Sequence, residues 1–135
     1  MSAKEKATAY HLRGFNCAQS VLCSCGAYTG LEEENALALS AGFGGGLRCG
    51  EVCGAVSGGV MAVGLCCRYT DEHDLQTKEH IAALSRELTG RFRERFGALR
   101  CEEIMGDKSR CPEYIEYMAA LTEQTIQKIK KQEST

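Results

Sequence analysis

The sequence has no tryptophan, only one proline, and no segment that alternates apolar and polar side chains over the length of a strand. Half-buried strands show that alternation, whereas helices show apolar residues at a spacing of three to four. Few chain-breaking residues interrupt such helical patterns here. These absences predict an all-α protein.

Strong net charge and long apolar segments are also missing. A formal net charge of -2 gives little attraction for nucleic acid or an anionic membrane. The N-terminal stretch MSAKEKATAYHLRG is charged and lacks the apolar core of a signal peptide. The uncharged segment Val52–Cys67 is shorter than the roughly 18–20 residues that span a bilayer. We therefore expect a cytoplasmic protein with neither a membrane nor a nucleic-acid partner.

Several common motifs are absent. No cysteines have the C-x-x-C spacing of zinc ribbons and thioredoxin-like proteins, and no C-x-x-C-H could attach haem. The glycines of 45–50 are followed by Glu51 rather than by Lys-Ser/Thr, so they do not form a phosphate-binding P-loop. His11, His73 and His80 stand apart in polar stretches and are expected at the surface. A metal site would have to be assembled from distant cysteines.

The helical patterns predict one domain over residues 1–135, with its core at about 14–130. The expected fold is a compact bundle of about five to six helices around a short, buried, Gly/Ala-rich central helix. Gly14 and Gly30 suit helix ends, while Asn16 and the Asp71–Asp74 segment offer caps. Pro112 suits the first turn of the last helix. A short helical turn is expected at Cys101–Met105, followed by a chain turn at Gly106-Asp107.

The central stretch is Gly42–Cys67, which opens with glycines and continues as an apolar segment. Gly44, Gly45 and Gly46 would let the backbone turn tightly beside a buried site, although an ordinary loop explains them as well. The spacing of Gly54 and Gly58 favours close helix packing, either inside the bundle or across a possible homodimer.

Nine cysteines make thiol chemistry the main functional clue. An odd number without an export signal is typical of the reducing cytosol, where cysteines more often bind metals or do redox chemistry than form structural disulfides. Four of them lie at expected helix starts, which favour the thiolate: Cys17, Cys53, Cys101 and Cys111. We interpret the cysteines within expected helices as small buried apolar residues: Cys23, Cys25, Cys66 and Cys67.

Two kinds of centre fit these thiols. Four reduced thiols that meet would suit an iron–sulfur cluster or a tetrahedral zinc ion. Two that meet would suit a disulfide switch, in which one thiolate attacks and the other resolves. The guanidinium of Arg48, next to Cys49, would also favour a thiolate.

The cysteine pattern resembles the C_GCAxxG_C_C family, which is named for it. The likeness extends from Gly14 to about Met118. It is carried by NCAQSV at 16–21, GFGGG at 42–46, CGAVSG at 53–58, CEEIMG at 101–106, and Cys111. The resemblance implies a small, mostly bacterial, helical protein with a redox role. It also implies that the four characteristic cysteines are Cys17, Cys53, Cys101 and Cys111. A similar module in split-Soret cytochromes c implies a non-haem iron–sulfur centre, although the haem-attachment part is absent here.

The leading hypothesis is a redox or electron-transfer protein that binds a metal centre, an iron–sulfur cluster, through those four thiolates. The residues expected around the centre are Gly44, Gly45, Gly46, Arg48 and Cys49. One alternative is a metal-free thiol–disulfide protein, and another is a module that binds a soft metal such as zinc or uses its cysteines structurally. An enzymatic role, if any, would be that of an oxidoreductase with an unidentified redox partner.

Overall fold

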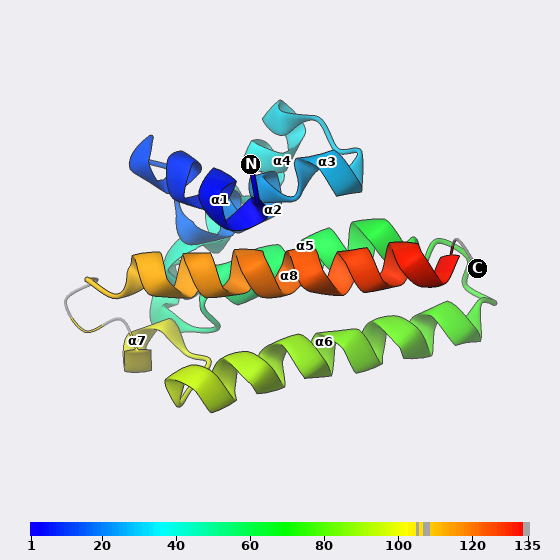
Figure 1. Ribbon diagram of the computed structural model, residues 1–135. Coiled ribbons are helices and arrows are strands. Elements are labelled where there is room, and N and C mark those ends of the chain that lie inside the picture. Colours follow the sequence, from blue (N-terminus) through cyan, green and yellow to red (C-terminus); the bar gives the residue numbers. More distant parts are fainter. Residues whose placement is uncertain (105, 107–108, 134–135) are drawn as a thin grey trace.

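The computed structural model describes residues 1–104, 106 and 109–133, and within these the chain is all-α (Figure 1). Val52 and Arg100 form an isolated antiparallel bridge, and the described residues contain no strand. The helices are α1 (Ala3–Leu12), α2 (Cys17–Ser24), α3 (Gly26–Thr29), α4 (Glu33–Ser40), α5 (Gly54–Cys67), α6 (Leu75–Phe96), α7 (Cys101–Ile104) and α8 (Cys111–Glu133), with short turns at Ala41–Phe43 and Gly46–Gly50. The predicted all-α fold is confirmed.

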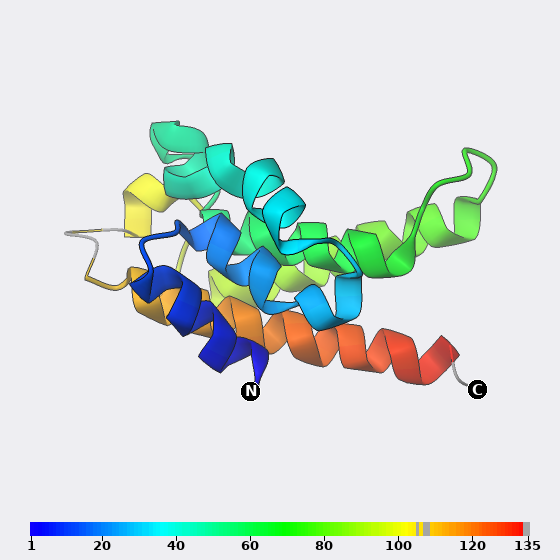
Figure 2. The ribbon, with the colours of Figure 1, turned by 90° about the horizontal axis from the view of Figure 1, so that it is seen from above.

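Helix α5 is the buried centre of the bundle. It packs against α2, α6 and α8, and the two views show α8 running alongside it (Figures 1 and 2). Its glycines permit this packing, because a Cβ at Gly58 would lie 2.6 Å from the Ala18 carbonyl oxygen, and one at Gly59 would lie 2.6 Å from Thr122 Oγ1. Other helices of the same chain thus cover the glycine face of α5. The homodimer stays a prediction, and this face gives it no support.

Most helix ends follow the capping residues expected from the sequence. The Asn16 side chain accepts a hydrogen bond from Gln19 N–H, and the Gln19 side chain accepts one from Asn16 N–H. The Asp74 side chain accepts from Thr77 N–H at the start of α6. Gly14 has φ +102°, a left-handed conformation that glycine adopts readily. These caps fix where α2 and α6 begin.

Two expected helices end early. The segment between Asn16 and Gly30 divides at Cys25 into α2 and α3, and α4 ends at Ser40 before a tight turn. In both places a serine hydroxyl donates to a carbonyl of the preceding turn, with Ser24 Oγ 2.6 Å from Val21 O. Such side-chain bonds compete with the helical pattern. The expected helical turn near Cys101 is present as α7, whereas Met105 and Asp107 lie outside the described residues.

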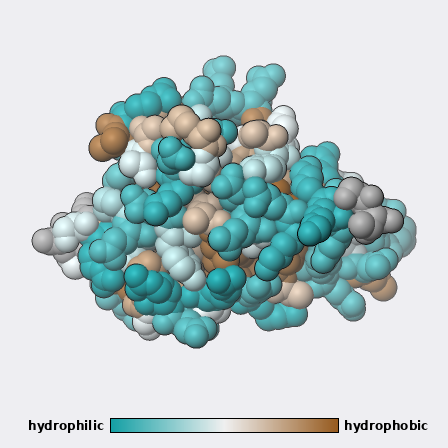
Figure 3. Space-filling model, viewed as in Figure 1, coloured by the Kyte–Doolittle hydropathy of each residue, from teal (hydrophilic) through white to brown (hydrophobic). Residues whose placement is uncertain are grey.

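The visible face of the molecule is mainly hydrophilic (Figure 3). Within the described part of the chain, no helix is both long and apolar enough to cross a membrane.

Candidate redox centre

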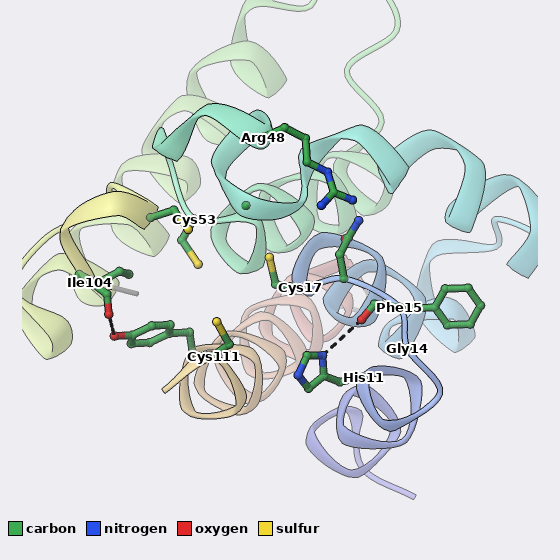
Figure 4. Close-up of a pocket in the computed structure, with 12 residues that line it drawn as sticks. His11, Gly14, Phe15, Cys17, Arg48, Cys53, Ile104 and Cys111 are labelled. Atoms are coloured by element: carbon green, nitrogen blue, oxygen red, sulfur yellow. Dashed lines mark hydrogen bonds between the residues drawn. The ribbon is translucent and has the colours of Figure 1, made fainter. Parts of the chain in front are cut away.

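Four cysteines from four separate segments line one cavity of about 280 Å³ (Figure 4). Cys17, Cys101 and Cys111 are the first residues of α2, α7 and α8, and Cys53 immediately precedes α5. The remaining lining residues are His11, Gly14, Phe15, Asn16, Gly45, Arg48, Ile104 and Tyr114. The fold therefore brings together the four cysteines that the sequence placed at helix starts, while their chemical role stays a prediction.

Backbone pairing holds two of the cysteines in place. Cys53 N–H donates to the Leu99 carbonyl at 2.8 Å, and Cys101 N–H donates to the Glu51 carbonyl at 2.6 Å. Arg100, between these two contacts, pairs with three glutamates. Because the two segments are joined directly beside both thiols, the spacing of Cys53 and Cys101 is set by main-chain contacts rather than by flexible side chains.

Cys17 lies unusually close to the start of α5. A Cβ added at Gly54 would lie 2.5 Å from Cys17 Sγ and 2.8 Å from the Phe43 carbonyl oxygen. Real Cβ atoms do not approach other heavy atoms that closely, so a residue with a side chain would displace the sulfur or the helix. Glycine after Cys53 is therefore required by the position of the Cys17 sulfur.

The Cys17 and Cys53 side chains share a hydrogen bond that separates their acidities. The Cys53 thiol donates to the Cys17 sulfur and lowers the pKa of Cys17 to about 6; burial opposes this, and backbone N–H groups including that of Gly45 assist. The same contact, together with burial, raises the pKa of Cys53. At neutral pH the pair is accordingly a Cys17 thiolate with a Cys53 thiol.

The glycine loop turns in the left-handed sense beside this pair. Gly45, Gly46, Leu47 and Arg48 have φ between 60° and 64°. Gly46 has no alternative, because a Cβ there would overlap the backbone of Glu51. At Leu47 and Arg48 the conformation costs about 1–2 kcal/mol each. The expected tight turn is present, and its extension over two residues with side chains was not expected.

Of the other residues expected around the centre, only some line the cavity. Gly45 and Arg48 line the cavity. Gly44 and Gly46 are buried beside it without lining it. Cys49 is exposed, and its thiol donates to the Gly46 carbonyl at 3.5 Å, outside the cavity lining.

His11 was missed by the sequence analysis. His73 and His80 are exposed as expected, but His11 is half-buried and lines the cavity. Its Nδ1 lies 3.2 Å from the Phe15 carbonyl oxygen, which can only accept, so Nδ1 carries a proton and Nε2 is free for other partners. The expectation of a surface residue was wrong because α1 ends against the cavity.

The cysteines of the helix interiors have the properties of buried apolar residues. Burial raises the pKa of Cys25 to about 12 and that of Cys23 to about 11. Burial also raises the pKa values of Cys66 and Cys67. Protonated thiols are poor nucleophiles and poor ligands. None of these four cysteines has the lowered thiol pKa of Cys17.

The donor set can be tested against the proposed metals. A structural zinc ion needs four ligands at about 2.0–2.3 Å from one point. Among the described residues, no three His, Cys, Asp or Glu side chains gather closely enough to hold one ion. Four thiols spread around a cavity suit an iron–sulfur cluster better, because several iron and sulfide ions stand between the ligating sulfurs.

Comparison with known proteins adds one match. The family described as "Putative redox-active protein (C_GCAxxG_C_C)" matches residues 15–125, a range that includes all four cavity cysteines. No curated protein and no solved structure matches the chain.

Proposed function

The chain belongs to the C_GCAxxG_C_C family, and we propose that it is an electron-transfer protein that holds an iron–sulfur cluster through Cys17, Cys53, Cys101 and Cys111. The observation that carries the proposal is the placement of these thiols around one cavity, where the described residues contain no group of three His, Cys, Asp or Glu side chains close enough to hold a single ion. When bound, the cluster would supply one-electron redox chemistry.

The protein's own groups suit this task. Cys17 is held as a thiolate before any metal arrives, so one ligand needs no deprotonation at neutral pH. The Gly45 N–H that stabilises this thiolate would remain directed at a ligating sulfur. Hydrogen bonds to ligating sulfurs and nearby positive charge raise a cluster's potential. Gly45 and Arg48 would thus tune the potential from the same loop.

Single substitutions test the ligand assignment. Cys17→Ser, Cys53→Ser, Cys101→Ser and Cys111→Ser are each expected to lower the iron and sulfide content of protein purified without oxygen. Cys67→Ser is the matched control, because Cys67 is a partly buried thiol outside the cavity. Equal iron content in all five variants and the unchanged protein would contradict the assignment.

A second candidate function is thiol–disulfide exchange, and the hydrogen bond between Cys17 and Cys53 favours it. The Cys17 thiolate would attack a substrate disulfide and release one thiolate. Cys53 would then attack the Cys17 sulfur, releasing the second thiolate as it gives up its proton. Both protein thiols are oxidised and both substrate sulfurs are reduced, so the exchange needs no other reagent.

The two candidates differ in what they predict for Cys101 and Cys111. Exchange needs only Cys17 and Cys53, so the Cys101→Ser and Cys111→Ser variants would keep a reversible disulfide of full yield. A cluster needs all four thiols. Mass spectrometry of metal-free protein, alkylated before and after reduction, measures that yield.

A further inference from the structure

We propose that the mouth of the four-thiol cavity binds the anionic group of a small substrate, which Arg48 holds beside the Cys17 sulfur. The inference rests on the proposed redox role of the cavity, because it names the class of molecule that would react there. It does not require a cluster, since the groups that carry it belong to the chain.

Arg48 is the one arginine or lysine among the described residues that line the cavity. Its exposed side chain extends from the glycine loop along the cavity wall (Figure 4), and no carboxylate is among the described residues that line the cavity. In the described part of the chain Arg48 forms no salt bridge, whereas Arg13, Arg100 and Arg110 each pair with glutamate. A paired arginine is largely neutralised toward an incoming anion. Arg48 keeps its charge for a ligand.

The backbone at Arg48 supports a role for its side chain. Arg48 has φ +61°, a conformation that glycine would adopt without strain. Strained residues with side chains cluster at functional sites, where the strain positions a group. At this position, the left-handed turn directs the guanidinium along the wall of the cavity that contains Cys17 (Figure 4).

His11 approaches the cavity from α1, on the side away from the glycine loop (Figure 4). Because Nδ1–H donates to the Phe15 carbonyl, the ring orientation is fixed and the neutral ring turns the lone pair of Nε2, an acceptor, toward other partners, so His11 forms part of the wall without holding the anion. The Asn16 amide, which also lines the cavity, bonds Gln19 N–H and the Ala41 carbonyl. Arg48 is therefore the group of this wall that we expect to hold the anion.

The size and lining of the cavity define the ligand class. A volume of about 280 Å³, with one arginine and mostly apolar and thiol surface, suits a small organic anion rather than a large polyanion. A carboxylate at Arg48 would place the rest of such a molecule toward the Cys17 sulfur. Small carboxylate-bearing oxidants, such as acidic disulfides, are therefore the substrate class we expect.

Two alkylating reagents test this directly on the metal-free, reduced full-length chain. Iodoacetate and iodoacetamide both react when the Cys17 thiolate displaces iodide, and they differ in charge. The ratio of their rate constants at Cys17, measured by mass spectrometry, cancels any change in the Cys17 pKa. We expect Arg48→Gln to lower the iodoacetate-to-iodoacetamide ratio about fivefold, as for the loss of one nearby charge pair.

Three further variants separate charge from structure. Arg48→Lys should leave the iodoacetate-to-iodoacetamide ratio close to that of the unchanged protein. Arg48→Gly should lower the ratio as Arg48→Gln does, although glycine relieves the strained backbone. Arg13→Gln is the matched control, because it removes the same charge from an arginine that is paired with Glu33, and it should leave the ratio unchanged.

An unchanged ratio in Arg48→Gln, or an equal fall in Arg13→Gln, would overturn the proposal. Circular dichroism verifies that each variant is folded, and Arg48→Gly, which relieves the strained backbone, retains the test if Arg48→Gln unfolds. The readout is independent of metal, so a failure here is distinguishable from a failure to find a cluster.

Discussion

The Cys53 thiol donates a hydrogen bond to the Cys17 sulfur, and this one contact gives two neighbouring cysteines opposite acidities. The two residues are far apart in the sequence and meet because α2 and α5 pack together. Gly54 allows the approach, and the Gly45 N–H adds a second donor to the same sulfur. Three segments thus contribute to one stabilised thiolate: the start of α2, the start of α5 and the glycine loop.

Removing the donor should make Cys17 less acidic. We expect Cys53→Ala to raise the Cys17 pKa from about 6 toward the ordinary value of 9.0, and Cys53→Ser to raise it less, because serine keeps an O–H donor. The pH dependence of Cys17 alkylation in metal-free protein measures this. Cys25→Ala is the control, since Cys25 lies outside the cavity. An identical Cys17 profile in Cys53→Ala and the unchanged protein would contradict the assigned contact.

The same pair should give the reduced, metal-free protein a characteristic pH dependence of stability. The folded pKa of Cys17 is about 6 against 9.0 in the unfolded chain, so its contribution is full above pH 9 and is lost as the pH falls to 6. The raised pKa of Cys53 acts oppositely: stability is lost as the pH rises above 9. The difference in unfolding free energy between this protein and Cys17→Ser/Cys53→Ser should therefore peak near pH 9.

Denaturant titrations under reducing conditions at several pH values provide this comparison. The remaining cysteines are common to both proteins and cancel in the difference. A difference that does not vary between pH 6 and 9 would show that Cys17 has an ordinary pKa in the folded state.

The glycine after Cys53 should be much less replaceable than a glycine further along the same helix. A Cβ at Gly54 meets Cys17 Sγ at 2.5 Å, whereas one at Gly64 meets nothing within 4 Å. We expect Gly54→Ala to destabilise the fold by about 1–3 kcal/mol through overpacking. Gly64→Ala should stabilise it by about 0.5–1 kcal/mol, because alanine favours the helix. Chemical denaturation of both variants measures the contrast, and equal effects would refute the close approach.

The sequence allowed much of the fold to be predicted, because local signals determine it. Asn16, Asp74 and Pro112 mark helix starts through their own chemistry, and the uncharged central segment had to be buried. The division of the second helix at Cys25 was not predictable in this way. It depends on a serine hydroxyl that bonds a carbonyl of the preceding turn, and the pattern of apolar residues does not show that choice.

For the site, the sequence identified the cysteines but not their surroundings. Helix starts favour thiolates wherever they occur, so Cys17, Cys53, Cys101 and Cys111 could be selected before their positions were known. His11 could not, because its place at the cavity depends on how α1 packs on α2 and α8, which its sequence neighbours do not show. The left-handed backbone of Leu47 and Arg48 was also hidden, since neither residue type favours that conformation.

The central claim is that the four-thiol cavity holds an iron–sulfur cluster, and the most direct measurement is iron and acid-labile sulfide analysis of protein purified without oxygen, together with its visible spectrum. We expect iron and sulfide in matching amounts and a sulfur-to-iron charge-transfer absorption that is lost in Cys53→Ser. Colourless, metal-free protein in which Cys17 and Cys53 form a reversible disulfide would contradict it and establish thiol–disulfide exchange in its place.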